Sequence, residues 1–250
     1  RLIFAVKSHD HITVFVITNE SFGCLLKMSK NIRNENKIAL SYHDSLLRES
    51  DVQLLRGPHW INDNIIGFYF EYLDKKTKDS KHSKNLLFAS PELTQLLKLT
   101  QSSDWEALLD PINAKSSSFI FFPLNNCDSR ESGGGTHWSL LVYSQVENKC
   151  FHFDSCQGLN AAAAKNFTQK TLDYFCTKGS DSYHEINCPQ QDNGYDCGLY
   201  VLCFTDSIVE HTMQQSKMNN CQFRNVGVLV NDKRKNLLEM IKVHDALELL

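Results

Sequence analysis

The sequence lacks a marked excess of charge of either sign. Its 250 residues include 26 lysine and arginine residues against 29 aspartate and glutamate residues, which leaves a net charge of −3. A protein that binds phosphate backbones usually presents a strong positive charge. We therefore expect no nucleic-acid partner.

The sequence also lacks long hydrophobic runs. Its longest apolar segments, such as residues 120–122 and 199–204, fall far short of the roughly 20 residues that a membrane-spanning helix needs. The apolar block at residues 12–17 is too short, and its flanks are too polar, for a signal peptide. We therefore expect no membrane partner and an intracellular protein, in the cytoplasm, the nucleus or both.

Among the nine cysteines, no two form a C-x-x-C pair. That absence excludes a zinc ribbon and a thioredoxin motif, and the odd number argues against a secreted disulfide framework. A chain of this length buries roughly three quarters of its unfolded surface, so it needs no disulfide or structural metal. We expect reduced thiols that pack as small hydrophobic groups, and ask whether one of them differs.

Residues 1–37 differ from the rest of the chain, because an apolar block there gives way to a polar run without periodic apolar residues. We expect the main domain to begin near Ile38 and to span residues 38–250, with residues 1–37 as an N-terminal extension. Since the chain begins with Arg1, we expect a fragment or an unusual gene model, and our hypothesis is that Met28 is the true start and that the preceding residues are not native coding sequence. Peptides from those residues in the purified native protein would refute it.

Helices and strands are predicted from the periodicity of apolar residues. Helices are expected over residues 60–73, 90–99, 103–110, 160–177 and 198–212 and around residues 237–247, and strands over residues 118–122, 137–143, 149–154 and 183–187. A capping-box pattern at Ser103 and Glu106 and a glycine at position 179 mark two helix ends. Residues 74–85 and 125–136 are predicted to be exposed loops. This order predicts an α+β fold with a central mixed or antiparallel sheet flanked by helices.

The two central strands predict a contact between a histidine and an aspartate. A hairpin with a loop at residues 144–147 pairs Tyr143 with Asn148 and, counting outward, His137 with Asp154. Opposed Cβ atoms lie about 4.5–5.5 Å apart, so the carboxylate can hold one imidazole nitrogen and leave the other free. Because a shift of one residue would break this alignment, two unrelated strand ends are the alternative interpretation.

Cys197 differs from the other cysteines in its local sequence. It lies where a polar turn meets an apolar helix beginning near Gly198, with Asp196 placed as the N-cap. A thiol in the first helical turn meets the positive end of the helix dipole and unpaired backbone N–H groups, which favour a thiolate and can bind an oxyanion. Gln191, on the same turn, can supply a second oxyanion donor; taken alone, it is a solvated loop glutamine.

These residues carry a family resemblance. Residues 189–198 (PQQDNGYDCG), with GGTHW ending at Trp138 and FHFDS ending at Ser155, resemble the ubiquitin-like protease (sentrin/SUMO-specific protease) family of cysteine peptidases. The resemblance extends from about Ile38 to the C-terminus. It is strongest to the deneddylase members, which act on the ubiquitin-like modifier of cullins, through residues 41–47, 90–95 and 136–143.

The resemblance implies a papain-like cysteine peptidase fold and a mechanism. It implies Cys197 as the nucleophile, His137 as general base and then general acid, Asp154 as the orienting carboxylate and Gln191 as an oxyanion donor. The interpretation from the residues themselves gives the same roles. The implied reaction cleaves after the C-terminal diglycine of a ubiquitin-like modifier through a thioester. It needs no metal or organic cofactor.

The resemblance also implies substrate contacts. Trp60 and Trp138 would roof a channel that admits only a diglycine tail, and Asp63 would contact that tail. The alternatives are that Trp60 belongs to the core, that Trp138 points away from His137, and that Asp63 only charges a helix N-terminus. The expected partners are the modifier and its conjugates, such as cullins, and the protein is expected to be a monomer.

Other functions fit the same residues. A SUMO-specific protease or an acyltransferase would use the same fold and triad, and a pseudoprotease would bind a modifier without cleaving it. Probes that carry different modifier tails distinguish the SUMO-specific protease and the acyltransferase from the deneddylase. Unchanged activity after replacement of Cys197 by alanine would favour the last.

Overall fold

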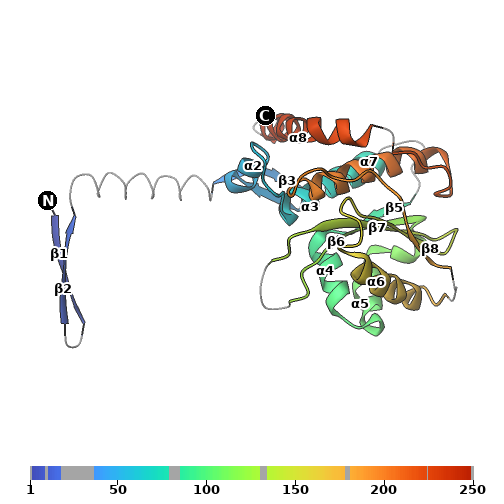
Figure 1. Ribbon diagram of the computed structural model, residues 1–250, viewed down its shortest axis with the longest axis horizontal. Coiled ribbons are helices and arrows are strands. Elements are labelled where there is room, and N and C mark those ends of the chain that lie inside the picture. Colours follow the sequence, from blue (N-terminus) through green and yellow to red (C-terminus); the bar gives the residue numbers. More distant parts are fainter. Residues whose placement is uncertain are drawn as a thin grey trace.

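The computed structural model describes residues 2–8, 11–17, 37–78, 85–129, 134–177, 181–223 and 225–248. Strands β1 (Leu2–Ser8) and β2 (His11–Ile17) pair with each other and with no other described strand. The other helices and strands are, in chain order, β3 (Ile38–Tyr42), β4 (Ser45–Arg48), α2 (Glu49–Leu54), α3 (Asp63–Lys78), β5 (Leu86–Phe88), α4 (Pro91–Leu99), α5 (Trp105–Leu109), β6 (Phe119–Asn125), β7 (Trp138–Ser144), β8 (Lys149–Phe153), α6 (Ala161–Tyr174), β9 (Tyr183–Glu185), α7 (Cys197–Gln214) and α8 (Val226–Glu248) (Figure 1).

A five-stranded sheet in the order β5-β6-β7-β8-β9 forms the centre of the domain. The β6–β7 and β7–β8 pairs are antiparallel, whereas the β5–β6 and β8–β9 pairs are parallel. Helices α3, α7 and α8 lie on one side of the sheet, and α4, α5 and α6 lie on the other (Figure 1). The predicted α+β class, with a mixed central sheet flanked by helices, is confirmed.

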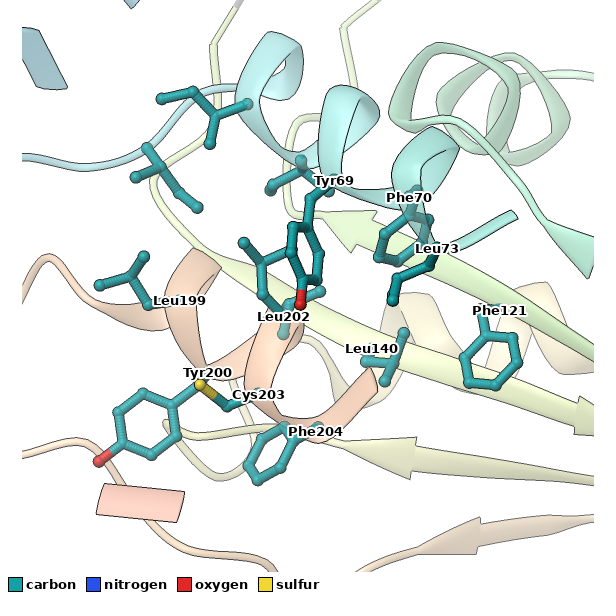
Figure 2. Close-up of a cluster of buried hydrophobic side chains, with 14 of the residues drawn as sticks. Tyr69, Phe70, Leu73, Phe121, Leu140, Leu199, Tyr200, Leu202, Cys203 and Phe204 are labelled. Carbon is teal, nitrogen blue, oxygen red and sulfur yellow. The ribbon is translucent and has the colours of Figure 1, made fainter. Parts of the chain in front are cut away.

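Every residue of β6 is buried, because helices cover both faces of the sheet. Phe119 and Phe121 belong to the core shared with α3 and α7, whereas Ile120 and Phe122 belong to the core shared with the helices of the other face. This alternation is the period of two expected of a strand. Figure 2 shows the first core, where side chains of α3, α7 and the sheet gather. Helix α7 is buried from Cys197 through its first turns, as predicted, and the core therefore fixes its N-terminal end.

The first long helix differs from its prediction at both ends. It was expected over residues 60–73, whereas α3 spans Asp63–Lys78. The segment at 74–78, predicted to be an exposed loop, continues the helix, and Lys78 Nζ lies 2.7 Å from Asp74 Oδ2 in an i,i+4 pair. Such pairs offset the low apolar content of a polar helix end. Residues 79–84 of the predicted loop lie outside the described residues, and Asn85 at its end is exposed, as predicted.

Two predicted helix ends are wrong. The capping box at Ser103 does not form, because a 3-10 turn precedes α5 and Asp104 takes the N-cap position without a side-chain bond. Helix α6 ends at Tyr174, because Cys176 adopts a φ of 52° and the Thr177 N–H then donates to the Leu172 carbonyl at 2.9 Å. This is a left-handed cap without glycine. Gly179, the predicted cap, lies outside the described residues.

Strands β3, β4 and β5 and helix α2 were not predicted, and β6 runs three residues past its predicted end at residue 122. The other differences are small. Strands β6 and β7 begin one residue later than predicted, and β9 is two residues shorter. Helix α8 begins well before the apolar residues that predicted it. No helix within the described residues combines the length and the apolar character needed to cross a bilayer.

Candidate active site

Cys197 is the first residue of α7, and the loop before it is held by its own side chains. Asp196 occupies the N-cap position, as predicted, but its side chain makes no capping bond. Instead, Asn193 Oδ1 accepts hydrogen bonds from the backbone N–H groups of Tyr195 and Asp196, both at 3.0 Å. The N–H groups of the first turn of α7 therefore keep no side-chain cap, which leaves the positive helix end beside the Cys197 thiol.

Gly198 allows the first turn of α7 to approach the segment that carries Trp60. A Cβ atom at Gly198 would lie 2.5 Å from Ile61 Cγ1 and 3.0 Å from Ile61 Cδ1. Ile61 is buried, so its side chain has little room to move away. The glycine is therefore required by close packing between two walls of the site.

We expect Gly198→Ala to lower the free energy of unfolding by about 1–3 kcal/mol, the usual cost of overpacking a core. Urea unfolding followed by fluorescence measures it. Gly194→Ala in the same loop is the matched control, because a Cβ there meets nothing within 4 Å. Its effect should stay within about 0.5 kcal/mol. Equal stability of the two variants would contradict the packing role of Gly198.

His137 and Asp154 are in contact, as predicted. His137 Nε2 lies 2.6 Å from Asp154 Oδ1, and both side chains are buried. The predicted register is wrong, however, because Tyr143 pairs with Cys150 and not with Asn148. Asn148 has a φ of 52°, which places it in the turn and not in a strand. The contact survives because a shift of two residues keeps every side chain on its face.

The surroundings of Asp154 keep its carboxylate ionised. Its Oδ1 accepts a hydrogen bond from the Cys156 N–H at 2.9 Å, and its Oδ2 accepts one from the Asn160 N–H at 3.0 Å. Burial raises the pKa of Asp154, but the hydrogen bonds from His137 and these two N–H groups outweigh burial and lower the pKa. An ionised Asp154 can orient and stabilise a protonated imidazole.

His137 is held in its protonated form. Burial lowers the pKa of His137, but hydrogen bonds to Asp154 and Cys197 and the charges of these groups outweigh burial and raise the pKa to about 9. Because Nε2 faces Asp154, Nδ1 is the ring nitrogen left to face Cys197. A thiol at a helix N-terminus beside an imidazolium is the arrangement that yields a reactive thiolate.

Gln191 is anchored in the loop before Cys197. Its Oε1 accepts a hydrogen bond from Ser155 Oγ at 2.8 Å, and its Nε2 donates to the Asn193 carbonyl at 2.6 Å. Ser155 directly follows Asp154, so this contact links the loop to the end of β8. An amide nitrogen carries two hydrogens, and the bond to Asn193 uses one of them.

A cleft of about 810 Å³ opens beside Cys197. It is lined by three residues predicted to bind substrate, Trp60, Asp63 and Trp138, together with Cys197. His137 and Gln191 are not among its lining residues. Trp60 is 49% exposed, so the alternative that it belongs to the core is wrong, and Trp138 lies on the cleft wall although it neighbours His137. The structure thus brings the predicted substrate residues into one cleft with the thiol.

Asp63 belongs to the cleft and to a helix end at once. It is the first residue of α3, and its Oδ1 accepts a hydrogen bond from the Asn64 N–H at 3.1 Å. Its carboxylate therefore stabilises the helix N-terminus while it lines the cleft. The two interpretations of this residue are compatible.

Other residues that line the cleft were not predicted. They come from α4 and from the described ends of the loop at residues 125–136, and include Glu92, Gln95, Leu96, Cys127 and Thr136. Gln95 Nε2 donates to the Cys127 carbonyl at 2.8 Å, and the Thr136 N–H donates to Asn126 Oδ1 at 2.7 Å. No local sequence pattern marks these contacts, because α4 and the loop meet only in the folded chain.

Within the described residues, no group of three histidine, cysteine, aspartate or glutamate side chains is arranged to hold a metal ion. The chemistry that this site offers is that of a thiol, an imidazole and a carboxylate. These are the groups that a cysteine peptidase uses, and of the three only the Cys197 thiol is among the residues that line the cleft.

Comparisons with known proteins agree with this class. Residues 59–242 match the C-terminal catalytic domain of the Ulp1 protease family. The chain is 41% identical to human sentrin-specific protease 8 over 180 residues, which cover 71% of this chain and 84% of that protein. It is 35% identical to NEDD8-specific protease 1 of Arabidopsis thaliana over 223 residues, which cover 85% of this chain and 95% of that protein. The chain belongs to the Ulp1 protease family, and the predicted family is confirmed.

Solved structures support the fold. The C-terminal Ulp1 protease domain, determined in complex with Smt3, the yeast orthologue of SUMO, superimposes with a TM-score of 0.62. The match covers 91% of this chain and 96% of that domain, at 18% sequence identity. A likeness at this identity establishes the Ulp1-like protease fold and nothing about the substrate.

Proposed function

We propose that the protein is a deneddylase that hydrolyses the bond after the C-terminal diglycine of the ubiquitin-like modifier of cullins. The sequence similarity to proteases named for NEDD8 supports the choice of modifier. The observation that best supports the mechanism is the 2.6 Å contact between His137 Nε2 and Asp154 Oδ1. A cysteine nucleophile needs an imidazole to transfer protons and a carboxylate to orient that imidazole. Precursors of the modifier and its conjugates, such as cullins, are the proposed substrates.

In this proposal, Cys197 is the nucleophile. Its thiolate attacks the carbonyl carbon of the terminal glycine, and the protonated His137 donates its proton to the leaving amine. Water then attacks the thioester, with His137 now acting as the base, and releases the modifier with a free carboxylate. Asp154 holds the imidazole in place through both steps.

The developing oxyanion meets two kinds of donor. The free N–H groups at the start of α7 are one, and the second hydrogen of Gln191 Nε2 is the other. Donors fixed in advance stabilise a tetrahedral intermediate without reorganisation. The contacts of Gln191 with Ser155 and Asn193 supply this rigidity.

Trp60 and Trp138 are proposed to bind the tail of the modifier. Both line the cleft with Cys197, and a tail residue larger than glycine would collide with their indole rings. Asp63, on the same side, is proposed to accept a hydrogen bond or pair with a positive charge of the tail. This wall would therefore select a diglycine end.

The pairing of the strands and the state of the cysteines bear on the domain boundary and on the compartment. We propose that residues 38–250 form the peptidase domain and that residues 1–37 are an extension, since β1 and β2 pair only with each other among the described strands. An intracellular site, in the cytoplasm or nucleus, is supported by the eight described cysteines, all of which are free thiols. A monomer is proposed.

Electrophilic probes test the choice of modifier. We expect a probe with the NEDD8 tail to label Cys197 at least about tenfold faster than probes with SUMO or ubiquitin tails, a difference of about 1.4 kcal/mol. A NEDD8 probe with alanine in place of the penultimate glycine should react slowly, because the indoles exclude its methyl group. Mass spectrometry of the labelled peptide gives the site and the rate.

The alternatives predict other outcomes of the same experiment. Faster labelling by the SUMO probe would make the protein a SUMO protease. Normal labelling without release of modifier into water, but with transfer to an added amine, would make it an acyltransferase. A folded protein that binds the modifier but whose Cys197 reacts with no probe would be a pseudoprotease. Cys197→Ala is the control for labelling at other cysteines.

A further inference from the structure

Arg234, on helix α8, contacts three separate segments around the active site. Its Nη1 donates to the Leu54 carbonyl at 2.8 Å, and its Nη2 donates to the His59 carbonyl at 2.7 Å. Nη2 also lies 2.5 Å from Asp196 Oδ1. The two side chains of this ion pair are only 15% and 12% exposed, so solvent screens the pair weakly.

These contacts join the segment that carries Trp60 to the segment that carries Cys197, outside the cleft surface. His59 directly precedes Trp60, and Asp196 directly precedes Cys197, while Trp60 and Cys197 both line the cleft. On the cleft side, Trp60 Nε1 donates to the Gly194 carbonyl at 2.5 Å. Arg234 is thus a second tie between the same walls, placed in a helix that contributes nothing to the cleft surface.

The contact of Arg234 with Asp196 extends to the predicted oxyanion donor. Asp196 Oδ2 accepts a hydrogen bond from Asn193 Nδ2 at 2.9 Å, and the Asn193 carbonyl accepts one from Gln191 at 2.6 Å. A chain of contacts therefore runs from Arg234 through Asp196 and Asn193 to Gln191. Loss of its first link would loosen the whole loop before Cys197.

The charge of Asp196 gives Arg234 a second role. A carboxylate directly before Cys197 opposes negative charge on the thiol by like-charge repulsion, and the neutral Asn193 amide that donates to Asp196 Oδ2 at 2.9 Å does not cancel the charge of the carboxylate. The guanidinium neutralises it. Other ionisable groups around the site are His137, whose positive charge favours a thiolate, Asp63, Glu92 and Cys127 on the cleft wall, and Asp192 in the loop before Cys197.

We propose that Arg234 is a positioning residue, which fixes the separation of Trp60 from Cys197 and cancels the charge of Asp196 beside the thiol. The proposal rests on the proposed function in taking Cys197 as the nucleophile. Arginine suits the task because its planar fork serves three oxygen acceptors in fixed directions, whereas a lysine ammonium acts as a point charge.

A neighbouring residue provides a matched control. Lys233 is also buried in α8, and its Nζ lies 2.5 Å from Asp206 Oδ2 and 2.7 Å from the Tyr69 hydroxyl. It ties α8 to α7 and α3 without touching the cleft. Lys233→Met therefore removes an ion pair of α8 whose lysine is buried and whose aspartate is 36% exposed, and it leaves the site intact. Arg234→Met removes the ion pair that holds the site.

Steady-state kinetics on a modifier with a fluorogenic leaving group, with urea unfolding of the same samples, test the positioning. Both methionine variants should unfold at lower urea concentration. Only Arg234→Met should lower kcat/KM, by about 10- to 100-fold, with a raised KM because the Trp60 wall is no longer fixed. Arg234→Lys should recover part of the loss. Equal losses of activity in Arg234→Met and Lys233→Met would overturn the proposal.

The rate of Cys197 alkylation by iodoacetamide against pH tests the charge. In Arg234→Met, which removes the positive charge, the profile should move to higher pH. In Arg234→Lys, which keeps the charge, it should stay near that of the wild type. In Asp196→Asn, which preserves the shape of the side chain, it should move to lower pH, because the guanidinium remains. A purely structural role would not move the two profiles in opposite directions, and two unmoved profiles would overturn this part of the proposal.

The outcomes also separate this proposal from the proposed function. If the wild type hydrolyses the modifier, Cys197→Ala abolishes hydrolysis and Arg234→Met leaves kcat/KM unchanged, only the role of Arg234 is overturned. A wild-type protein without hydrolysis, whose alkylation profile still responds to Arg234 and Asp196 in opposite directions, would support the positioning role and overturn the proposed function.

Discussion

Replacement of Cys197 by alanine is expected to lower kcat/KM for a diglycine-tailed modifier by at least about 10⁴-fold, the loss usual when the nucleophile of a catalytic triad is removed. Of the two cysteines among the described lining residues, Cys127 and Cys197, it is Cys197 whose thiol hydrogen-bonds to His137. Binding of the modifier should survive, because Trp60 and Trp138 remain. Single-turnover hydrolysis and a separate binding isotherm measure the two effects.

Cys203→Ala provides the control. Cys203 lies on the same helix, in the core shown in Figure 2, and burial raises the pKa of its thiol to about 12. It therefore stays a thiol at neutral pH and should tolerate replacement with little change in kcat/KM. Residual turnover of the Cys197→Ala variant above about one part in 10³ would mean that another group performs the reaction.

The thiol and its partners could be found in the sequence because each has a local signature. Cys197 follows a polar turn and begins an apolar helix, a pattern that specifies a helix N-terminus. His137 and Asp154 flank a short hairpin, so strand alternation alone places them on one face. The hairpin register could not be obtained in the same way, because it depends on Asn148 adopting a positive φ in the turn.

The contacts that join the walls of the cleft could not be predicted, because they are polar contacts between residues far apart in the sequence. Trp60 meets Gly194 across a separation of 134 residues, and Arg234 meets Asp196 across 38. The helix ends failed for a related reason. Gly179 has the residue type of a cap, but Cys176 takes the left-handed conformation earlier, and residue type is only a tendency there.

Replacement of Asp154 by asparagine is expected to lower kcat/KM at neutral pH by about 10²–10⁴-fold. The two oxygens of Asp154 accept from the N–H groups of Cys156 and Asn160 as well as from His137. In either orientation, the NH₂ group of the asparagine must therefore face a hydrogen-bond donor, which is His137 together with the Cys156 N–H or the Asn160 N–H. The imidazole loses its orientation together with the charge that keeps it protonated.

The pH dependence identifies the cause of this loss. The reactive form needs a protonated His137, whose pKa is raised to about 9, so activity of the wild type should fall as the pH rises through about 9. Without the Asp154 charge, burial still lowers the pKa of His137, and the alkaline limb of kcat/KM should move to lower pH. Glu185→Gln is the matched control, since Glu185 Oε1 lies 3.0 Å from Nδ1 of His152, a second buried histidine outside the cleft. That variant should keep its alkaline limb near pH 9. An unmoved limb in Asp154→Asn would show that it reports a group other than His137.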